Sequence, residues 1–489
     1  MKRIGHCLHW FRNDLRLDDN RALASAVAFA DRTTCLFVID TDLLAAHKRA
    51  TKRRAFMAAC LGQLERDLAK RGLTLLLVAG RADQVIPEVV TQLDVARVTF
   101  GRDYSPLAKR RDASVVQALQ SMHVEIHTTK DRVVFEADEV RTKGDTPYRV
   151  YTPYRRTWLQ AFASGDVAPI PLPQPRRQAV DQPSVDGSTT ATELSIGEAM
   201  DLINPDRAST LIPGGEDAAQ RALTRFIESQ MEHYDQHRDI AAADATSRLS
   251  PYLRFGVISA RRCLDTARAA LGEGGQDGAA TWMDQIVWRE FYTAILDSFP
   301  DVLEASFKPE TAAIRWNIDD DAFRAWCEGR TGYPFVDAGM RQLVSEGWMH
   351  NRARMVTASF LVKDLLIDWR LGQRFFAQHL LDGDPALNNG GWQWCASTGT
   401  DAQPYFRIFN PTRQGQRFDP DGQYVSKWVP ELREVPKRWI HEPWKAPHRP
   451  AHYPLPIVDH SRQRSITVTR FQAARGRHRE QDSSLGHTP

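Results

Sequence analysis

The chain has 489 residues, of which 42% are hydrophobic and 26% are charged. These proportions are ordinary for a globular protein and exclude a disordered or collagen-like chain. The longest apolar runs, such as residues 73–78, are far shorter than the ~20 residues that cross a bilayer. The first residues also carry charges where a signal peptide needs an apolar core. We therefore expect a cytoplasmic protein that does not associate with membranes.

The net charge is only +3, because 64 Lys and Arg face 61 Asp and Glu. This balance does not by itself predict nucleic-acid binding, although a local basic patch can still bind DNA. The six cysteines form no CxxC pair, so we expect neither a metal site nor a disulfide framework. Instead they should be small buried side chains in a reducing compartment.

Residues 1–130 alternate short apolar runs with stretches of helical periodicity. This order predicts an α/β domain with a doubly wound parallel sheet. Ligands of such sheets lie at the carboxyl ends of the strands, where the aromatic and basic loop 10–16 follows the first strand. No GxGxxG or Walker lysine motif occurs, which argues against ordinary dinucleotide or P-loop binding. The predicted strands are 4–8, 34–39, 73–78, 97–100 and 124–127, and the predicted helices are 52–70, 84–93 and 107–120.

Residues 131–210 include the proline-rich stretch 168–175 and the polar stretch 180–190, so we predict an interdomain linker. Residues 211–455 show helical patterns and no series of strands, which predicts an all-α domain. Residues 456–489 are polar and rich in arginine, and we predict a flexible basic tail. The predicted helices are 218–233, 251–271 (with Ser250 as N-cap and Pro251 in the first turn), 282–299, 321–327, 335–347, 351–366 and 374–381.

Tryptophan is concentrated in one part of the chain. Eleven of the 13 tryptophans lie between Trp282 and Trp444. Large aromatic side chains are costly to leave loosely ordered. This region should therefore contain a packed aromatic core or an aromatic binding site.

Three groups of residues suggest a binding site. The run 246–250 places hydroxyls and an arginine at a predicted helix start, which suits either a phosphate or simple capping. Asn351 and Arg354 share one face of a predicted helix, where they could bind a ligand or only be solvated. The stretch 382–394 combines two adjacent asparagines, the adjacent glycines 390 and 391, and two tryptophans. That mixture suits a planar ligand with polar edges, because Gly390 and Gly391 permit close approach of the backbone.

Several long motifs identify a family resemblance. They are WFRNDLRLDDN (10–20), TSRLSPYLRFG (246–256), IVWREFY (286–292), GWMHNRARMVTASFLVKDLLIDW (347–369) and DGDPALNNGGWQWCASTGTDAQPYFRIFNP (382–411). In order and spacing they resemble the cryptochrome/photolyase family over residues 1–450. Within that family the chain is most similar to the class I cyclobutane pyrimidine dimer photolyases.

The resemblance implies an α/β antenna domain, a linker and a C-terminal helical domain that binds FAD. It also implies light-dependent repair of cyclobutane pyrimidine dimers in DNA, driven by an electron from photoexcited reduced FAD. A cryptochrome-like blue-light photoreceptor with weak or no repair activity is the alternative, and a light-independent flavoprotein is disfavoured. The expected partner is double- or single-stranded DNA containing pyrimidine dimers, and we expect a monomer.

The resemblance also assigns roles to residues of the cofactor site. Asn388 should face the flavin N5, and Arg354 and Asp382 should form an ion pair beside the isoalloxazine ring. A cation there favours the anionic reduced flavin. The full FAD-binding set is Tyr234, Thr246, Ser247, Arg248, Leu249, Ser250, Arg354, Asp382, Asp384 and Asn388.

Electron transfer and DNA binding are assigned in the same way. Trp392, Trp369 and Trp316 match the family's chain of three tryptophans, from the flavin outward. Trp288 and Trp394 match the pair that walls the dimer pocket, where aromatic faces replace lost base stacking. The predicted substrate- and DNA-binding residues are Arg238, Gln285, Trp288, Asn351, Arg352, Met355, Trp394 and Arg407, with the arginines acting on phosphate charge.

The chain departs from the family pattern at the substrate site. Dimer-repairing members carry Glu where this chain has Gln285, and members that repair the (6-4) lesion carry Gln. The (6-4) enzymes, however, have two histidines where this chain has Asn351 and Met355, and it therefore lacks their general acid.

The chain also departs from the family pattern at the antenna site. Members that bind methenyltetrahydrofolate carry an Asn-Glu pair where this chain has Leu107 and Ala108. We therefore expect a deazaflavin, in preference to a folate, or no antenna. The candidate pocket residues are Trp10, Arg12, Arg53, Phe56 and Tyr104, each of which could equally be a packing residue.

Overall fold

The computed structural model describes residues 4–165, 167–175, 184–185, 191–272 and 276–485. By compactness the chain divides into two units. The first comprises Met1–Tyr148, Thr152–Asp235 and Ser247–Pro300, and the second comprises Arg149–Tyr151, Gln236–Thr246 and Asp301–Pro489. The domain boundaries expected at residues 130, 210 and 455 do not coincide with this division and stay a prediction.

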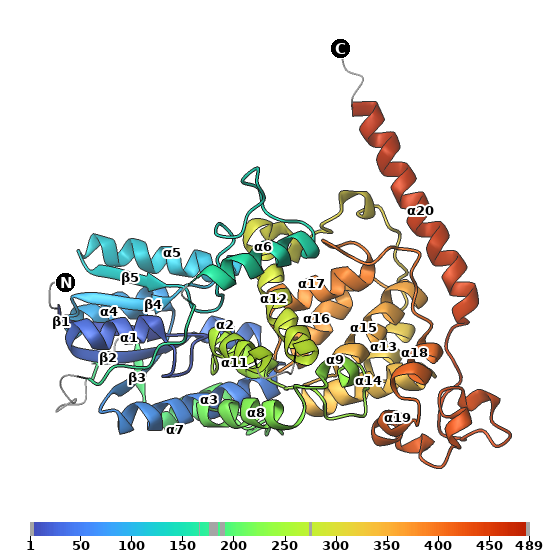
Figure 1. Ribbon diagram of the computed structural model, residues 1–489, viewed down its shortest axis with the longest axis horizontal. Helices are drawn as coiled ribbons and strands as arrows, with labels where there is room; N and C mark the ends of the chain where they lie inside the picture. Colours follow the sequence, from blue (N-terminus) through green and yellow to red (C-terminus); the bar gives the residue numbers. More distant parts are fainter. Residues whose placement is uncertain (1–3, 166, 176–183, 186–190, 273–275, 486–489) are drawn as a thin grey trace. The chain divides into compact units, whose positions relative to one another are not determined.

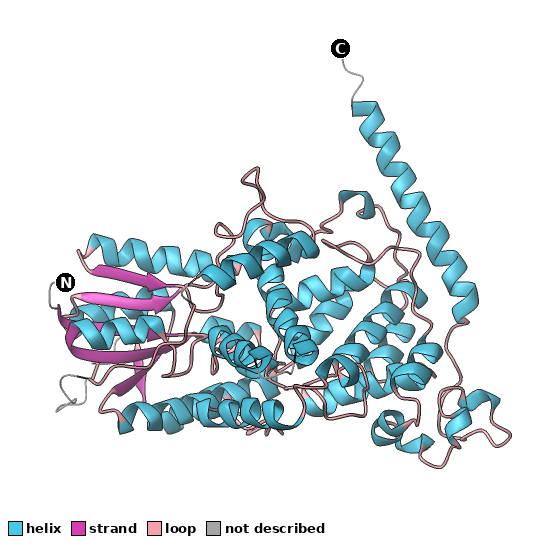
Figure 2. Cartoon of the chain, in the orientation of Figure 1, coloured by secondary structure: helices cyan, strands magenta, loops and turns pink. Residues whose placement is uncertain are grey.

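The first unit is built on one six-stranded sheet (Figure 2). Its order is β5-β4-β1-β2-β3-β6, and all neighbours are parallel except β6, which runs antiparallel to β3. The predicted parallel sheet is confirmed. The unexpected β6 lies in the predicted linker, whose polar stretch 180–190 falls almost entirely outside the described residues. The strands are β1 (Ile4–Phe11), β2 (Ala30–Ile39), β3 (Thr74–Ala79), β4 (Arg97–Gly101), β5 (Glu125–Thr129) and β6 (Thr192–Leu194).

Alternating side chains along the strands bury both faces of this sheet. Leu8, Leu36 and Val98 point to the face covered by α4 and α5, while Cys7 packs against Ala26 of α1 on the opposite face. Burial on both faces explains why these strands are continuously apolar. The connecting helices are α1 (Arg21–Phe29), α2 (Thr41–Ala46), α3 (Thr51–Lys70), α4 (Ala82–Gln92) and α5 (Pro106–Ser121).

The rest of the first unit is helical (Figure 1). The helix predicted over 251–271 is interrupted, because Gly256 has a φ of +60° and a side chain there would collide with the backbone of Asn13. Ser250 is the first residue of α10 and not its cap, which corrects the capping prediction. The elements are α6 (Tyr151–Ser164, whose first residue belongs to the second unit), α7 (Ile196–Ile203), α8 (Glu216–Ser229), α9 (Tyr234–His237, shared with the second unit), α10 (Ser250–Arg254), α11 (Ala260–Gly272) and α12 (Gln276–Ser298).

The second unit is helical, and its described residues contain no strand beyond an isolated bridge between Asn317 and Ile367. Its core is one contiguous cluster that gathers most of the tryptophans beyond residue 310. The main elements are α13 (Asp320–Cys327), α14 (Pro334–Glu346), α15 (Asn351–Ser359), the π-helical turn η3 (Phe360–Asp364), α16 (Trp369–His379), α17 (Pro385–Ala396), α18 (Pro411–Phe418), α19 (Gln423–Trp428) and α20 (His460–Leu485). Short 3₁₀ turns are η1 (Pro300–Leu303), η2 (Pro309–Thr311), η4 (Pro430–Leu432), η5 (Lys437–Trp439) and η6 (Pro443–Lys445).

The C-terminal segment is the main difference from expectation. Residues 460–485 of the predicted flexible tail form the helix α20. Thr467, Phe471 and Ala474 follow helical spacing, are all buried, and make one face of the helix. Phe471 and Ala474 pack with Ile314 and Leu366, and this burial offsets the ordering cost of an otherwise polar segment.

Two further observations complete the fold. Among the described residues, no helix is both long enough and apolar enough to cross a membrane. All six cysteines are free thiols, and all except Cys327 are buried.

Candidate functional site

An ion pair in the second unit joins Arg354 of α15 to Asp382. The two guanidinium nitrogens of Arg354 donate to the two Asp382 carboxylate oxygens, at 3.1 and 2.8 Å, and Arg354 Nε donates to Met349 O at 2.8 Å. Asp382 is buried. The expected ion pair is therefore present, and the guanidinium is held in one orientation. Its place beside a flavin stays a prediction.

The stretch 382–394, predicted to contact a planar ligand, is largely the helix α17. Asp384 caps this helix by accepting from the backbone N–H groups of Ala386 and Leu387, at 2.9 and 3.3 Å. Asn388 donates through Nδ2 to Gln373 O at 3.0 Å. Gly391 is exposed, and a Cβ there would meet nothing within 4 Å. The helix was missed in the sequence because glycine and asparagine are weak helix formers.

The three predicted electron-transfer tryptophans share one core. Trp392 and Trp369 are fully buried in the central cluster of the second unit, and the half-buried Trp316 packs against that cluster. Among the described residues, no acceptor lies within hydrogen-bond distance of Nε1 of Trp392 or Trp369. By contrast, the neighbouring Trp326 donates its indole N–H to Thr357 O at 3.0 Å. Two buried indoles without an acceptor are uncommon, since buried indole N–H groups usually find a partner.

The residues predicted for the FAD phosphates lie mainly in the first unit, around the loop before α10. Ser247 Oγ accepts from Trp282 Nε1 at 3.4 Å, and Arg248 has a φ of +50°, a conformation uncommon outside glycine. Leu249 is buried beneath the loop, while Ser250 begins a helix of only five residues. A helix dipole from so short an element is weak, so the hydroxyls and backbone N–H groups are the stronger argument for a phosphate here.

The other predicted cofactor residues on this side differ in burial. Tyr234 is buried, and its ring centre lies 5.6 Å from that of Phe226 in an edge-to-face arrangement. Thr246, at the boundary of the second unit, is half-buried. Both offer hydroxyl groups to a polar ligand.

Two predicted substrate residues lie one helical turn apart on α12. Gln285 is half-buried, and its Nε2 donates to Thr281 O at 3.1 Å. Trp288 is also half-buried, and its ring centre lies 5.5 Å from that of Tyr292. The spacing of three residues places both side chains on one face of the helix.

The predicted DNA-contacting residues of the second unit include two arginines that share one carboxylate and one exposed arginine. Arg352 donates to Asp239 Oδ2 at 2.6 Å and lies 4.3 Å above the Phe418 ring, and Asp239 also lies 4.0 Å from Arg238. Arg407 is exposed. A shared carboxylate partly neutralises the two paired arginines, so Arg407 has the charge most available for phosphate.

The remaining predicted substrate residues of this unit border its core. Asn351 is exposed and points its Nδ2 at Met355 Sδ, 3.8 Å away. Met355 and Trp394 are half-buried and pack against the central cluster. Each therefore presents part of its surface to solvent.

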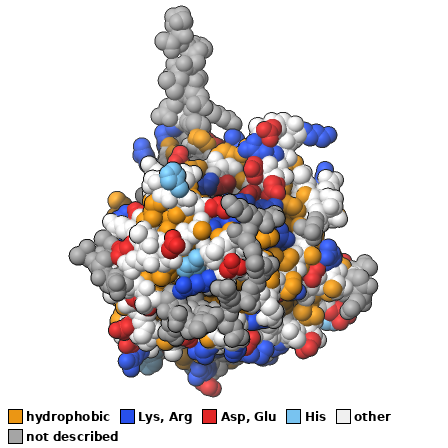
Figure 3. Space-filling model, turned by 90° about the vertical axis from the view of Figure 1, so that its left-hand side faces the viewer, with side chains coloured by type: hydrophobic (Ala, Val, Ile, Leu, Met, Phe, Trp, Pro, Cys, Tyr) orange, Lys and Arg blue, Asp and Glu red, His pale blue; other side chains and the backbone are white. Residues whose placement is uncertain are grey.

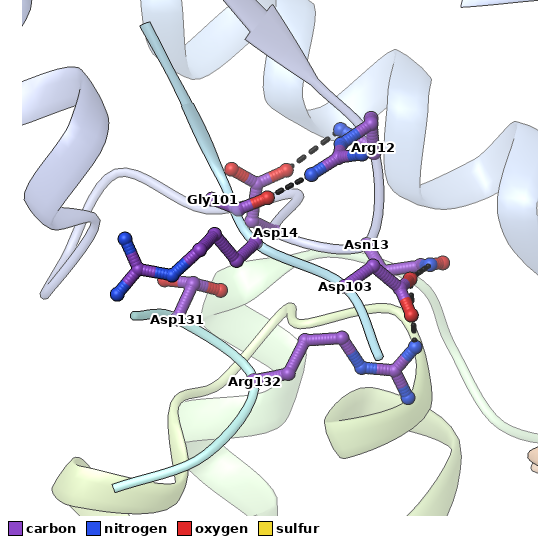
Figure 4. A pocket seen from close by; sticks show the side chains of 8 residues that line it. Arg12, Asn13, Asp14, Gly101, Asp103, Asp131 and Arg132 are labelled. Carbon is purple, nitrogen blue, oxygen red and sulfur yellow. Dashed lines mark hydrogen bonds and ion pairs between the residues drawn. The ribbon is translucent and has the colours of Figure 1, made fainter. Parts of the chain in front are cut away.

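A small polar pocket opens in the first unit at the ends of β1 and β4 (Figure 4). In the strand order, β2 and β4 lie on opposite sides of β1, so this is the topological switch point where α/β sheets bind ligands. Arg132 and Asn13 both donate to Asp103, at 3.0 and 2.9 Å. The positive charges of Arg132 and Arg12 hold the Asp103 pKa far below its usual value, although burial opposes them. The lining residues are Arg12, Asn13, Asp14, Gly101, Arg102, Asp103, Asp131 and Arg132.

Of the five antenna candidates, only Arg12 lines this pocket. Its guanidinium lies 4.6 Å above Trp10 and pairs with Asp112 at 2.5 Å. Trp10 itself belongs to the core beneath α4 and α5. The other candidates, Arg53, Phe56 and Tyr104, are buried in the first unit.

Two adjacent ionisable residues that the sequence analysis missed, Lys363 and Asp364, are buried at the end of η3. Burial lowers the pKa of the Lys363 ammonium to about 7, and its Nζ donates to Ser397 Oγ at 2.9 Å. Burial raises the pKa of Asp364 to about 6, although its partner His460, at 2.6 Å, opposes the shift. Both residues are contacted by α20, through Thr467 and His460.

On the one face shown in Figure 3, charge does not single out a site among the described residues. On the face seen in Figure 3, positive and negative side chains are interspersed among the coloured residues. This agrees with a net charge close to zero.

Comparison with known proteins identifies the family. Residues 7–176 match the family described as DNA photolyase, and residues 282–473 match the FAD binding domain of DNA photolyase. The chain is 41% identical to a deoxyribodipyrimidine photo-lyase of Salmonella typhimurium, over 96% of this chain and 98% of the relative. The chain belongs to the DNA photolyase family.

Other members agree over nearly the whole chain. A deoxyribodipyrimidine photo-lyase of Halobacterium salinarum is 42% identical, over 96% of this chain and 99% of the relative. The crystal structure of a bacterial class III photolyase from Agrobacterium tumefaciens matches with a TM-score of 0.87 and 33% identity, over 97% of this chain and 99% of that one. The resemblance expected from the motifs is therefore confirmed for the family and its FAD-binding domain. The roles of individual residues and the closeness to class I stay predictions.

Proposed function

We propose that this protein is a light-driven deoxyribodipyrimidine photo-lyase that splits cyclobutane pyrimidine dimers in DNA. The proposal rests on full-length likeness to relatives of that name. The structural observation that supports it best is the placement of Trp392, Trp369 and Trp316 in or against one core. A cryptochrome-like photoreceptor is not favoured, because the curated relatives that match over 96% of this chain are named deoxyribodipyrimidine photo-lyase.

The residues present suit FAD in their donor chemistry. The hydroxyls of Ser247, Thr246 and Tyr234 can donate to phosphate and ribityl oxygens. The fixed Arg354 guanidinium supplies a cation, and the Asn388 amide, anchored on Gln373, can exchange hydrogen bonds with a ring nitrogen. When bound, FAD supplies light absorption and the electron that opens the dimer. Arg354 stabilises negative charge on the reduced ring, and Asp382 keeps the cation in place.

The tryptophan core suits transport of an oxidising equivalent towards the surface. An indole that loses an electron becomes a cation, and its N–H becomes acidic. Because Nε1 of Trp392 and of Trp369 has no acceptor among the described residues, the proton stays on the indole. The electron hole then moves on instead of being trapped as a neutral radical. Half-buried Trp316 is the first of the three with access to water.

Substrate contacts are proposed to combine aromatic faces with phosphate charge. Trp288 and Trp394 each offer a half-buried indole for a flipped, unstacked base. Gln285 can donate its amide to a carbonyl oxygen on which negative charge develops. Arg407 contributes to backbone binding without reading sequence.

A second chromophore is proposed to bind near the polar pocket of the first unit. The pocket lies at the switch point of the sheet and presents the arginines 12, 102 and 132 together with Asn13. The position of a folate-binding Asn-Glu pair is occupied by Leu107 and Ala108, so we favour a deazaflavin. Mass analysis of chromophores released from the purified protein would test its identity.

The function itself is tested by repair under light. The reduced protein is illuminated with oligothymidylate that contains cyclobutane dimers, and the absorbance of restored thymine is followed. We expect repair in blue light and none in the dark. Absence of repair by protein that carries reduced FAD would overturn the proposal.

A further inference from the structure

An aromatic stack continues outward from Trp316. The ring of Phe471, on α20, lies 6.2 Å from Trp316 in an edge-to-face arrangement of 84°. Phe471 has a second aromatic neighbour, Tyr405. The two ring centres are 6.1 Å apart, and the rings are nearly parallel, with an interplanar angle of 5°. The three rings come from separate segments of the chain, and both Trp316 and Tyr405 border the same small apolar cluster.

The middle ring of this stack is held firmly. Phe471 is buried, and the Lys363 ammonium lies 3.8 Å from its centre. One turn earlier on α20, Thr467 Oγ1 donates to Lys363 O at 2.5 Å. Next to Phe471, Arg470 donates to Arg315 O at 3.0 Å. These bonds fix α20 against the segment that carries Trp316, so the stack is a lasting feature of the fold.

The outer ring can lose a proton when it is oxidised. Tyr405 is half-buried, so its phenol has access to water. The Arg475 guanidinium lies 5.4 Å from the ring centre, and Lys363 lies against the middle ring. Positive neighbours disfavour a cationic hole by Coulomb repulsion. A tyrosyl radical that has released its proton is neutral and escapes this repulsion.

We propose that Tyr405 is the terminal electron donor of the chain, beyond Trp316. In this step one electron passes from the Tyr405 phenol, past Phe471, to the oxidised Trp316 cation. Trp316 returns to its neutral form, the phenolic proton goes to water, and a neutral Tyr405 radical remains. An external thiol then returns one electron and one proton to the tyrosine. The inference rests on the proposed flavin-to-Trp316 path.

The identity of the final radical tests this assignment. Protein with oxidised FAD is flashed without thiol, and the long-lived radical is identified by transient absorption and by electron paramagnetic resonance. We expect a tyrosyl radical in the parent and a tryptophanyl radical in Tyr405→Phe. The matched control Tyr148→Phe, which alters a half-buried tyrosine of the first unit, should keep the tyrosyl signal. A tryptophanyl radical in the parent, or a tyrosyl radical that survives in Tyr405→Phe, would overturn the assignment.

Two further variants separate this inference from the proposed function. Phe471→Leu keeps an apolar side chain but removes the intervening ring, so the Trp316 radical should live longer before the tyrosyl signal appears. An unchanged Trp316 lifetime would exclude Phe471 from the path. Trp392→Phe should abolish both radicals while FAD stays bound. If radicals still form in Trp392→Phe, the proposed tryptophan path is wrong. If the parent repairs dimers but forms no tyrosyl radical, only the assignment of Tyr405 is wrong and the proposed function stands.

Discussion

The indole of Trp392 packs directly against the α-carbon of Gly372, and a side chain at Gly372 would overlap the six-membered ring. Helix α16 therefore needs glycine at this point to leave room for the buried indole. Leu361 closes the same space from another side. The position of the first predicted electron carrier is thus set by the absence of a side chain on a neighbouring helix.

Gly372→Ala should lower the free energy of unfolding by about 1–3 kcal/mol, the usual cost of overpacking a core. It should also slow photoreduction of the flavin, because Trp392 must shift. Chemical denaturation and flash photolysis measure the two effects. Gly476→Ala is the matched control: this helical glycine is exposed and a Cβ there meets nothing within 4 Å, so stability should not fall. Equal stability of Gly372→Ala and the parent would contradict the packing argument.

Asp382→Asn should destabilise the protein by about 1.5–3 kcal/mol, because a charge-assisted pair with a buried carboxylate is lost. FAD content after purification should also fall, since Arg354 is no longer held in one orientation. Absorbance of the purified variant and its unfolding curve provide the measurement. Asp421→Asn, which breaks an exposed pair with Lys437, should change stability by less than about 1 kcal/mol.

Gln285→Leu should reduce the quantum yield of dimer repair well below that of the parent, because the amide donor is lost. Gln285→Glu should raise it, since the family pattern that the motifs resemble places a carboxyl group at this position. FAD absorbance should be the same in all three proteins. Steady-state photorepair of dimer-containing oligothymidylate measures the yields. A Leu variant that repairs as well as the parent would show that this position is not a donor to the dimer.

Lys363→Met should remove a specific pH dependence of stability. Burial lowers the Lys363 pKa to about 7 in the folded protein, against 10.5 for an ordinary lysine. Between these values the unfolded chain binds more protons, so the parent gains stability as pH rises through this window. Below pH 7 the lysine is charged in both the folded and the unfolded state. The difference in free energy of unfolding between parent and variant should therefore not change with pH in that range. Unfolding curves of both proteins from pH 6 to pH 10 test this. If the free energy of unfolding depends on pH in the same way in parent and variant, the lowered pKa of Lys363 is wrong.

Arg407→Ala should weaken DNA binding about equally for all flanking sequences. The slope of log affinity against log salt should become shallower by about 0.9, the value for one phosphate contact. Arg330→Ala, an exposed arginine of the same unit paired with Glu328, should leave the slope unchanged. Titrations at several salt concentrations distinguish the two, and an unchanged slope for Arg407→Ala would remove this residue from the interface.

Local sequence determined most of the secondary structure. The five parallel strands appear where apolar runs predicted them, since a strand buried on both faces must be continuously apolar. The prediction of a flexible tail was wrong because Phe471 and Ala474 pack in a buried cluster with Ile314 and Leu366. These partners lie more than 100 residues away in the sequence. Helix α17 was missed for a similar reason: its glycines and asparagines oppose a helix that Asp384 and tertiary packing stabilise.

For function, the motifs determined the family, its FAD-binding domain and the residue types of the site. The resemblance also predicted the pairing of Arg354 with Asp382, and the structure contains this pair. Only the tertiary structure gave Asp384 a capping role and paired Arg352 with Asp239. It alone placed Lys363 and Asp364 beneath α20 and aligned Tyr405 with Trp316 across Phe471. The physical reason is that a residue's chemistry is intrinsic, whereas burial, charge pairing and ring stacking depend on neighbours that chain folding brings from distant positions.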